Sequence, residues 1–276
     1  MRTIIAMKGG GCKFTLAWAM VLAAGGCNKQ YPPVVLETSG VAPGLGTAEL
    51  AYVLTEAVAT DGRVKVGALK RSAGRLDAQL KRLAVTGPTA TPKLLPTAEH
   101  RLAYWYNARA AWAMKLLLLR DCPEELSDAA LLRRRFPLDG RTMTLEDIDA
   151  ILAAEANLRA VVAAPGVTFQ RARLPSRPLA PDDVRRRIAE RFAEFIDDKE
   201  RFVVDVPGRR VRVPPVLWQF HQRLIRHHQA TYGTEGATLT TALLAYVTGS
   251  PHRRLQDAIG YPCVAGRPDR RTARIE

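Results

Sequence analysis

Between residues 47 and 156, apolar side chains recur at the three- and four-residue spacing of amphipathic helices. The pattern predicts four helices, over residues 48–60, 66–85, 128–136 and 144–156. Thr47 is a candidate N-cap for the first helix, and Thr144 with Asp147 resembles a capping box before the last. The Pro- and Thr-rich residues 86–100 are expected to form a linker.

The pattern changes after residue 157. Two short β-branched runs on either side of Pro165-Gly166 predict strands over residues 158–164 and 167–170. Residues 201–215 alternate about a Pro-Gly turn and predict a β-hairpin. Helical spacing predicts the remaining elements, over residues 181–198, 216–228, 237–247 and 251–260. Val184, Ile188, Phe192 and Phe195 would form one apolar stripe on the first of these.

The segment 102–119, LAYWYNARAAWAMKLLLL, is apolar enough to suggest a membrane span. However, it contains Asn107, Arg109 and Lys115, and Arg or Lys near the centre of a bilayer costs about 2.5–3.5 kcal/mol each. We therefore expect a buried helix. Together the elements predict one α+β domain over residues 47–263, mostly helical with a small antiparallel sheet. Residues 28–46 would form a tether, and residues 264–276 a basic C-terminal tail.

The first 27 residues have the layout of a secretory signal. Basic residues precede the apolar residues 14–24, and Gly25-Gly26-Cys27 follows. This end resembles the lipobox of bacterial lipoproteins, although Ala24 stands where that family prefers Leu. Lipidation of Cys27 would attach the protein to a membrane of the cell envelope. The alternative is a secreted or periplasmic protein in which Cys27 is an incidental thiol.

The chain carries 41 Lys and Arg against 27 Asp and Glu, a net charge of +14. This excess fits an Arg-rich genome, a well-solvated surface, or attraction to an anionic envelope polymer or protein partner. No nucleic-acid-binding motif occurs, and no aromatic residues alternate with the basic ones as stacking platforms. Nucleic acid is therefore not an expected partner.

Four segments, in order, resemble domain-of-unknown-function family 547 (DUF547). They are DGRVKVGAL, LAYWYNARAAWAMKLLLL, FPLDGRTMTLEDIDAIL and ATLTTALLAYV. The resemblance covers residues 47–261 and implies a relation to papain-like or transglutaminase-like folds. Typical members of the family supply a His and Cys residues after the third segment, a pair suited to acyl transfer or hydrolysis. Here Val161 stands at the His position, Ala150 replaces a second His, and no Cys lies between Cys122 and Cys263.

The resemblance therefore implies a divergent, non-catalytic member, and we assign no catalytic residue, cofactor or metal. Asn107 occupies the Asn position of the family, where its amide would either tie a neighbouring loop or contact a ligand. We predict a ligand cleft that contains Trp105, Asn107, Arg159 and Trp218, with Val161 and Ala163 in its wall. His221 and His228 could share a helix face, but no third zinc ligand accompanies them.

Three functions remain open. The first is a binding or scaffolding domain of an envelope lipoprotein. The second is a cysteine-type hydrolase or acyltransferase whose nucleophile is displaced to Cys122 or Cys263. The third is a polyanion-binding protein. In an oxidising compartment, Cys122 and Cys263 could instead pair if the fold brings them together.

Overall fold

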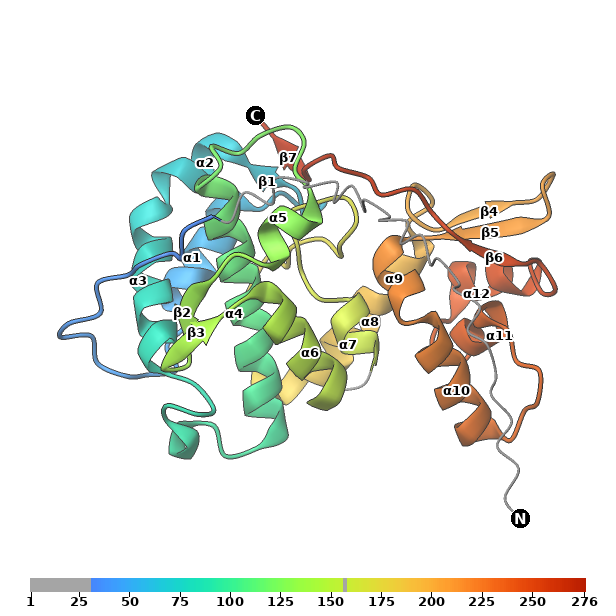
Figure 1. The fold of residues 1–276 in the computed structure, drawn as a ribbon, viewed down its shortest axis with the longest axis horizontal. Coiled ribbons are helices and arrows are strands. Elements are labelled where there is room, and N and C mark those ends of the chain that lie inside the picture. The colour runs from blue at the N-terminus through green and yellow to red at the C-terminus, as the bar shows by residue number, and fades with distance from the viewer. Residues whose placement is uncertain (1–30, 156–157) are drawn as a thin grey trace, which may run out of the picture. The chain divides into compact units, whose positions relative to one another are not determined.

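Helix α4 (Ala98–Leu118) is the central element of the fold (Figure 1). Among the described elements it packs against the 3-10 helix η2 (Pro181–Asp183) and five α-helices: α2 (Val66–Arg71), α3 (Ala73–Val85), α5 (Asp128–Leu132), α6 (Leu145–Glu155) and α8 (Val184–Asp197). The structure, a computed structural model, describes residues 31–155 and 158–276. Because neighbours cover several sides of α4, nearly every side chain from Leu102 to Leu117 is buried, and the predicted buried helix is confirmed. Among the described helices, none has the length and apolar character that crossing a membrane requires.

Local sequence signals set several helix boundaries. Thr144 and Asp147 form the predicted capping box before α6, since each backbone N–H donates to the other's side chain, at 2.8 and 3.1 Å. Thr47 precedes α1 (Ala48–Ala57), but its side chain makes no capping hydrogen bond. The helix predicted over residues 66–85 is divided at Ser72 into α2 and α3. The predicted stripe on α8 is buried as expected.

In the part of the chain that the structure describes, three small sheets accompany the helices. Strands β4 (Val203–Asp205) and β5 (Arg210–Val213) form the predicted antiparallel hairpin, and β6 (Cys263–Ala265) joins β5 in parallel. β1 (Val64–Lys65) and β7 (Arg274–Ile275) also pair in parallel, which differs from the single antiparallel sheet that we expected. β2 (Phe136–Leu138) and β3 (Arg141–Met143) form a second hairpin. Asp139 and Gly140 both have positive φ in its turn.

The strand predicted over residues 158–164 is wrong. Leu158–Val162 forms helix α7, and Val161 and Val162 are fully buried. α7 packs against both α6 and α8, so burial between two helices overrides the β propensity of its valines.

The strand predicted over residues 167–170 is also wrong. The segment contributes only an isolated bridge between Thr168 and Thr272 within the described chain. Its backbone instead turns on itself, because Gly166 N–H donates to Ala172 O at 2.9 Å and Arg171 N–H donates to Thr168 O at 3.1 Å.

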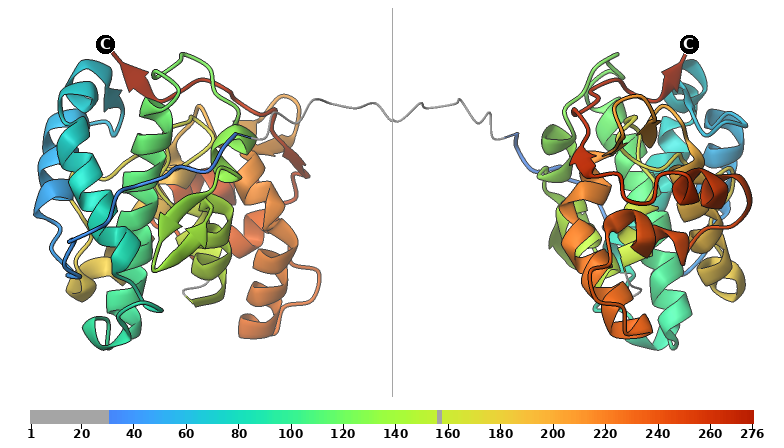
Figure 2. Two further views of the ribbon diagram at one scale, coloured as in Figure 1. Left: turned by 60° about the vertical axis from the view of Figure 1, so that its left-hand side comes forward. Right: turned by 90° about the vertical axis from the view of Figure 1, so that its right-hand side faces the viewer.

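The remaining helices follow β5 in the chain: α9 (Pro215–Gln219), α10 (His221–Tyr232), α11 (Leu239–Leu244) and α12 (Gly249–Gln256). Figure 2 shows the chain beyond β6 running back to β7, next to β1. Thr272 and Ala273 are buried there, so residues 264–276 are an ordered part of the fold. Residues 32–46 lie against the same unit, with Val34 N–H donating to Arg135 O at 2.8 Å. The mostly helical α+β fold of the prediction is confirmed.

Candidate functional site

Asn107 ties a loop to the central helix. Its amide nitrogen donates to Leu179 O at 2.9 Å, and its amide oxygen accepts from Leu179 N–H at 2.8 Å. The Asn107 side chain thus satisfies both backbone hydrogen-bonding groups of Leu179. It fixes the segment of residues 177–181, which we call the divider, against α4. The divider leads into a short 3-10 helix, η2 (Pro181–Asp183), at the start of α8.

The divider lies between two hollows and forms one wall of each. The first, the apolar hollow, has a volume of ≈ 450 Å³ and lies between the divider, α3, α4 and residues 44–47. Its apolar lining includes Leu45, Leu83, Leu95, Ala103 and Leu179. A mostly apolar cavity with a few polar groups is the usual form of a small-molecule site.

Gln79 and Asp183 both line the apolar hollow, and each has a buried side-chain oxygen without a hydrogen-bond partner among the described residues. The other carboxylate oxygen of Asp183 is bound by arginines, so Gln79 is the neutral acceptor of the two. Its side chain is 2% exposed, and its amide oxygen accepts no hydrogen bond within the described part of the chain. Gln79 lies three residues after Leu76 and four before Leu83, on the buried face of α3. Sequence reasoning missed it, although a polar residue at this spacing among leucines was a usable signal.

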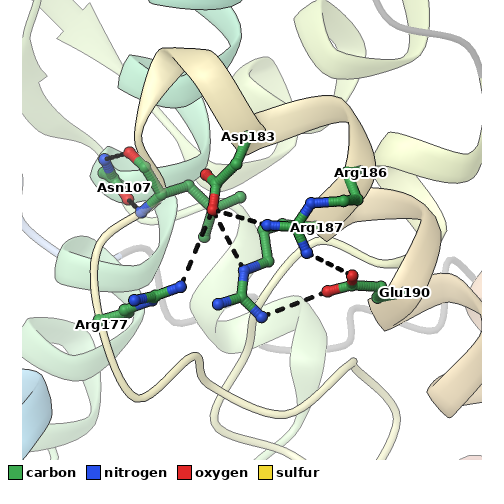
Figure 3. Close-up of polar contacts among 7 residues, drawn as sticks. Asn107, Arg177, Asp183, Arg186, Arg187 and Glu190 are labelled. Atoms are coloured by element: carbon green, nitrogen blue, oxygen red, sulfur yellow. Dashed lines mark hydrogen bonds and ion pairs between the residues drawn. The ribbon is translucent and has the colours of Figure 1, made fainter.

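The second hollow, the charged hollow, has a volume of ≈ 440 Å³ on the other side of the divider. Asp183 accepts hydrogen bonds from Arg186 at 3.2 Å and Arg187 at 3.3 Å, and Arg177 lies 3.9 Å away (Figure 3). Glu190 pairs with the same Arg186 and Arg187. These carboxylates neutralise the arginines beside the divider, so the cluster stabilises the divider and leaves little charge for a ligand.

The four residues predicted for one cleft do not come together. Trp105 is buried in the core, edge-on to Tyr104 with ring centroids 4.9 Å apart. Arg159 lies over the ring of Tyr246 at 5.1 Å, in a separate basic hollow of ≈ 300 Å³. Trp218 stacks on His221 at 4.0 Å. Only Asn107 of the four lines the apolar hollow.

The expected cleft wall is absent as well. Val161 and Ala163 have no exposed surface, so neither can line an open cleft. The backbone oxygen of Ala163 instead accepts a hydrogen bond from the hydroxyl of Tyr106, and burial raises the pKa of Tyr106 to about 12.

A buried ion cluster joins α4, α6 and the loop after α7. Asp149 binds Arg109 at 2.6 and 3.1 Å and Arg171 at 3.0 Å, with side chains 11%, 1% and 6% exposed. Arg109 also donates to Pro165 O. Burial alone would raise the pKa of Asp149, but the two guanidinium charges outweigh it and hold this pKa below its ordinary value. Each charge has a partner, so the cluster is structural.

The two cysteines of the described chain are poor nucleophiles. Both are free, with Cys122 almost fully buried and Cys263 half-buried. Burial raises the pKa of each thiol. The Cys263 sulfur lies 3.3 Å from the Thr240 hydroxyl, and no hydrogen bond joins a described cysteine to a histidine. Neither thiol has the base that acyl transfer needs.

The histidines on α10 have local partners. His221 contacts Trp218 O at 2.6 Å through Nδ1 and Gln222 at 2.9 Å through Nε2. His228 is buried, with its ring 4.7 Å from that of Tyr232. Across residues 31–155 and 158–276, no three His, Cys, Asp or Glu side chains gather as a metal site would require.

Many arginines elsewhere are neutralised on the surface, as in Arg75–Glu49 at 3.0 Å and Arg185–Glu99 at 2.8 Å. Residues 206–276 have the larger excess of charge, with eleven arginines against four Asp and Glu. Several exposed arginines in this part form no ion pair within the described chain: Arg212, Arg223, Arg226, Arg253 and Arg267.

Comparison with known proteins finds no matching family profile, no matching curated protein and no matching solved structure. The resemblance to family 547 stays a prediction from the four segments that carry it. Cys27 lies outside the described residues.

Proposed function

We propose that this chain is a divergent, non-catalytic relative of family 547. In this proposal Cys27 anchors it to a membrane of the cell envelope, and its folded part binds a small amphipathic molecule in the apolar hollow. The ligand would have an apolar body and one hydroxyl or amide N–H group. The unpartnered amide oxygen of Gln79 carries this proposal. A buried acceptor without a hydrogen bond costs about 1–3 kcal/mol, and a ligand that donates to it would remove this cost.

The position of the proposed tether supports the same function. Gly44 N–H donates to the Thr86 hydroxyl at 3.0 Å, and Arg82 donates to Gly46 O at 3.1 Å. These contacts hold residues 44–47 as one wall of the apolar hollow. The chain that would lead from the lipid anchor thus ends beside the site, which suits a ligand taken from a membrane.

Photolabelling tests the site in the full-length protein in detergent. The probe is a medium-chain alcohol with a photoreactive diazirine, and labelled peptides are mapped by mass spectrometry. We expect labels on α3 and α4 around the hollow. Leu45→Asp places a charge in the apolar wall and should abolish the labelling, and Gln79→Leu should weaken it. Ile259→Asp makes the same change at an exposed position outside the hollow and should leave labelling unchanged.

Labelling that is unchanged in Leu45→Asp, or that is spread over the surface, would contradict binding in the apolar hollow. The competing enzyme function is tested with thiol- and serine-directed activity probes on the same preparation. Covalent capture of Cys122 or Cys263 by such a probe at neutral pH would support the hydrolase function instead. Incorporation of radiolabelled palmitate, lost in Cys27→Ala, tests the anchor independently of both.

A further inference from the structure

Arg201 has a buried guanidinium group in which some nitrogens have no hydrogen-bond partner among the described residues. It lies between α8 and β4, and its side chain is only 4% exposed. Its Nε is 3.2 Å from Asp198 Oδ2, but its Nη2 has no hydrogen-bond partner among the described residues. Burial, and then the nearby charge of Arg173, lowers the pKa of Arg201 to about 10, so it stays charged at neutral pH. A buried charged donor without an acceptor is unfavourable unless an anion occupies the space beside it.

A small pocket borders the Arg201 side chain. It has a volume of ≈ 180 Å³, and Arg212 of β5 and Arg267, which follows β6, also line it. Apolar side chains complete the walls, including Val203, Pro214 and Pro215. The pocket shares no lining residue with the apolar hollow. Three arginines from separate segments therefore converge on one small cavity.

Phe169 lines the pocket and lies beside Arg201. The guanidinium carbon of Arg201 is 5.7 Å from the ring centroid, and those of Arg173 and Arg271 are each 4.5 Å away. Cation–π contacts of this kind hold planar guanidinium groups in place without using their N–H donors. Arg173 and Arg271 donate to carboxylates, whereas Nη2 of Arg201 has no partner among the described residues.

The carboxylates near the pocket do not cancel its charge. Asp269 is bound by Arg271 at 2.6 and 3.1 Å, and Asp198 serves both Arg201 and Arg173. Among the residues that line the pocket, Arg201, Arg212 and Arg267 face the carboxylates of Glu200 and Asp269, which leaves a net charge of +1.

We propose that this pocket binds a phosphate group, either as free phosphate or as a phosphate monoester. Guanidinium groups match phosphate oxygens in geometry and form strong charge-assisted hydrogen bonds with them. A tetrahedral phosphate accepts hydrogen bonds from three directions, which suits three arginines on separate segments around a pocket of net positive charge. A planar carboxylate would leave one of the three arginines unmatched. The pocket stands independently of the function proposed for the apolar hollow.

Isothermal titration calorimetry of the full-length protein in detergent tests this site. The probe is inorganic phosphate in a phosphate-free buffer at fixed ionic strength, and glycerol phosphate and acetate are titrated in parallel. Arg212→Gln and Arg267→Gln change exposed side chains, so both variants should fold. We expect each to weaken phosphate binding about tenfold or more, since each removes a charge-assisted hydrogen bond. Arg253→Gln is the matched control, an exposed arginine of α12 outside the pocket, and it should bind as the wild type does.

Arg201→Lys keeps the charge but removes the forked donors, and it should weaken binding if the variant folds. Tighter binding of glycerol phosphate than of inorganic phosphate would support a monoester ligand, and the reverse order would support free phosphate. Absence of saturable binding at millimolar phosphate would overturn the proposal. An equal loss in Arg253→Gln, or acetate binding as tight as phosphate, would overturn it too.

Discussion

We expect the substitution Asp149→Asn to destabilise this protein by about 3–5 kcal/mol, the usual cost of removing one partner from a buried ion pair. The Asp149 carboxylate accepts hydrogen bonds from Arg109 at 2.6 and 3.1 Å and pairs with Arg171 at 3.0 Å. The side chains of Asp149, Arg109 and Arg171 are buried, with exposed fractions of 11%, 1% and 6%. Asparagine has the same size and keeps one oxygen acceptor. The variant therefore removes the charge with little change of volume, and it leaves two buried guanidinium groups without this counter-charge.

The effect should depend on pH with a definite sign. The arginines outweigh burial and hold the pKa of Asp149 below the unfolded value of about 3.9. A lowered folded-state pKa gives stability that is fully present above the unfolded pKa and is lost as the pH falls through the folded one. The difference in unfolding free energy between wild type and Asp149→Asn should therefore be constant near neutral pH and shrink below about pH 4.

Urea denaturation followed by tryptophan fluorescence measures these differences. Glu49→Gln is the control, because its pair with Arg75 is partly exposed and should contribute about 0–1 kcal/mol. A triple variant, Arg109→Met, Asp149→Leu and Arg171→Met, removes every charge of the cluster and should be closer to wild type than the single variant. If Asp149→Asn were no more destabilising than Glu49→Gln, the cluster would not stabilise the fold as argued.

Three further predictions concern the divider, a close backbone approach and the thiols. Asn107→Leu leaves the backbone groups of the divider without their partners and should lower the unfolding free energy by about 1–3 kcal/mol; a loss no larger than that of Glu49→Gln would contradict the tie. In Gly87→Ala the new methyl group would meet the Asp139 carboxylate, so the melting temperature should fall, whereas Gly74→Ala within α3 has open space and should be neutral or stabilising. Ellman's reagent should modify Cys263 before Cys122 and either one only slowly at neutral pH, because both pKa values are raised; peptide mapping that shows Cys122 reacting first would refute this order.

Local signals in the sequence were sufficient for most helices. The capping box at Thr144 and Asp147, the apolar stripe of α8 and the hairpin of β4 and β5 all depend on neighbours within a few residues, and all three predictions are confirmed. The Asp139-Gly140 turn carried an equally local hairpin signal that sequence reasoning overlooked.

Long-range packing explains the failures. The valines of α7 favour a strand by propensity, yet burial between α6 and α8 makes them helical, and no local pattern reports that burial. The pairing of β1 with β7 joins residues about two hundred positions apart, so the apparent tail could not be recognised as part of the fold. For the site, the sequence singled out Asn107 but could not name Leu179 as its partner. Arg159 was assigned through the family resemblance, and neither that resemblance nor the aromatic character of Trp105 and Trp218 says how far these residues lie from Asn107.

The two binding proposals rest on unpartnered polar atoms that belong to residues lining hollows of the described chain. The two described thiols support neither proposal, since burial raises their pKa values and neither has a histidine hydrogen-bond partner among the described residues. Two of the buried side chains with unpartnered polar atoms in the described chain carry the binding proposals, and they are of opposite kinds. Gln79 offers an acceptor in apolar surroundings, and Arg201 offers charged donors in a pocket of net positive charge. These groups select different ligand chemistries and share no residue, so a variant that abolishes one binding event should leave the other intact.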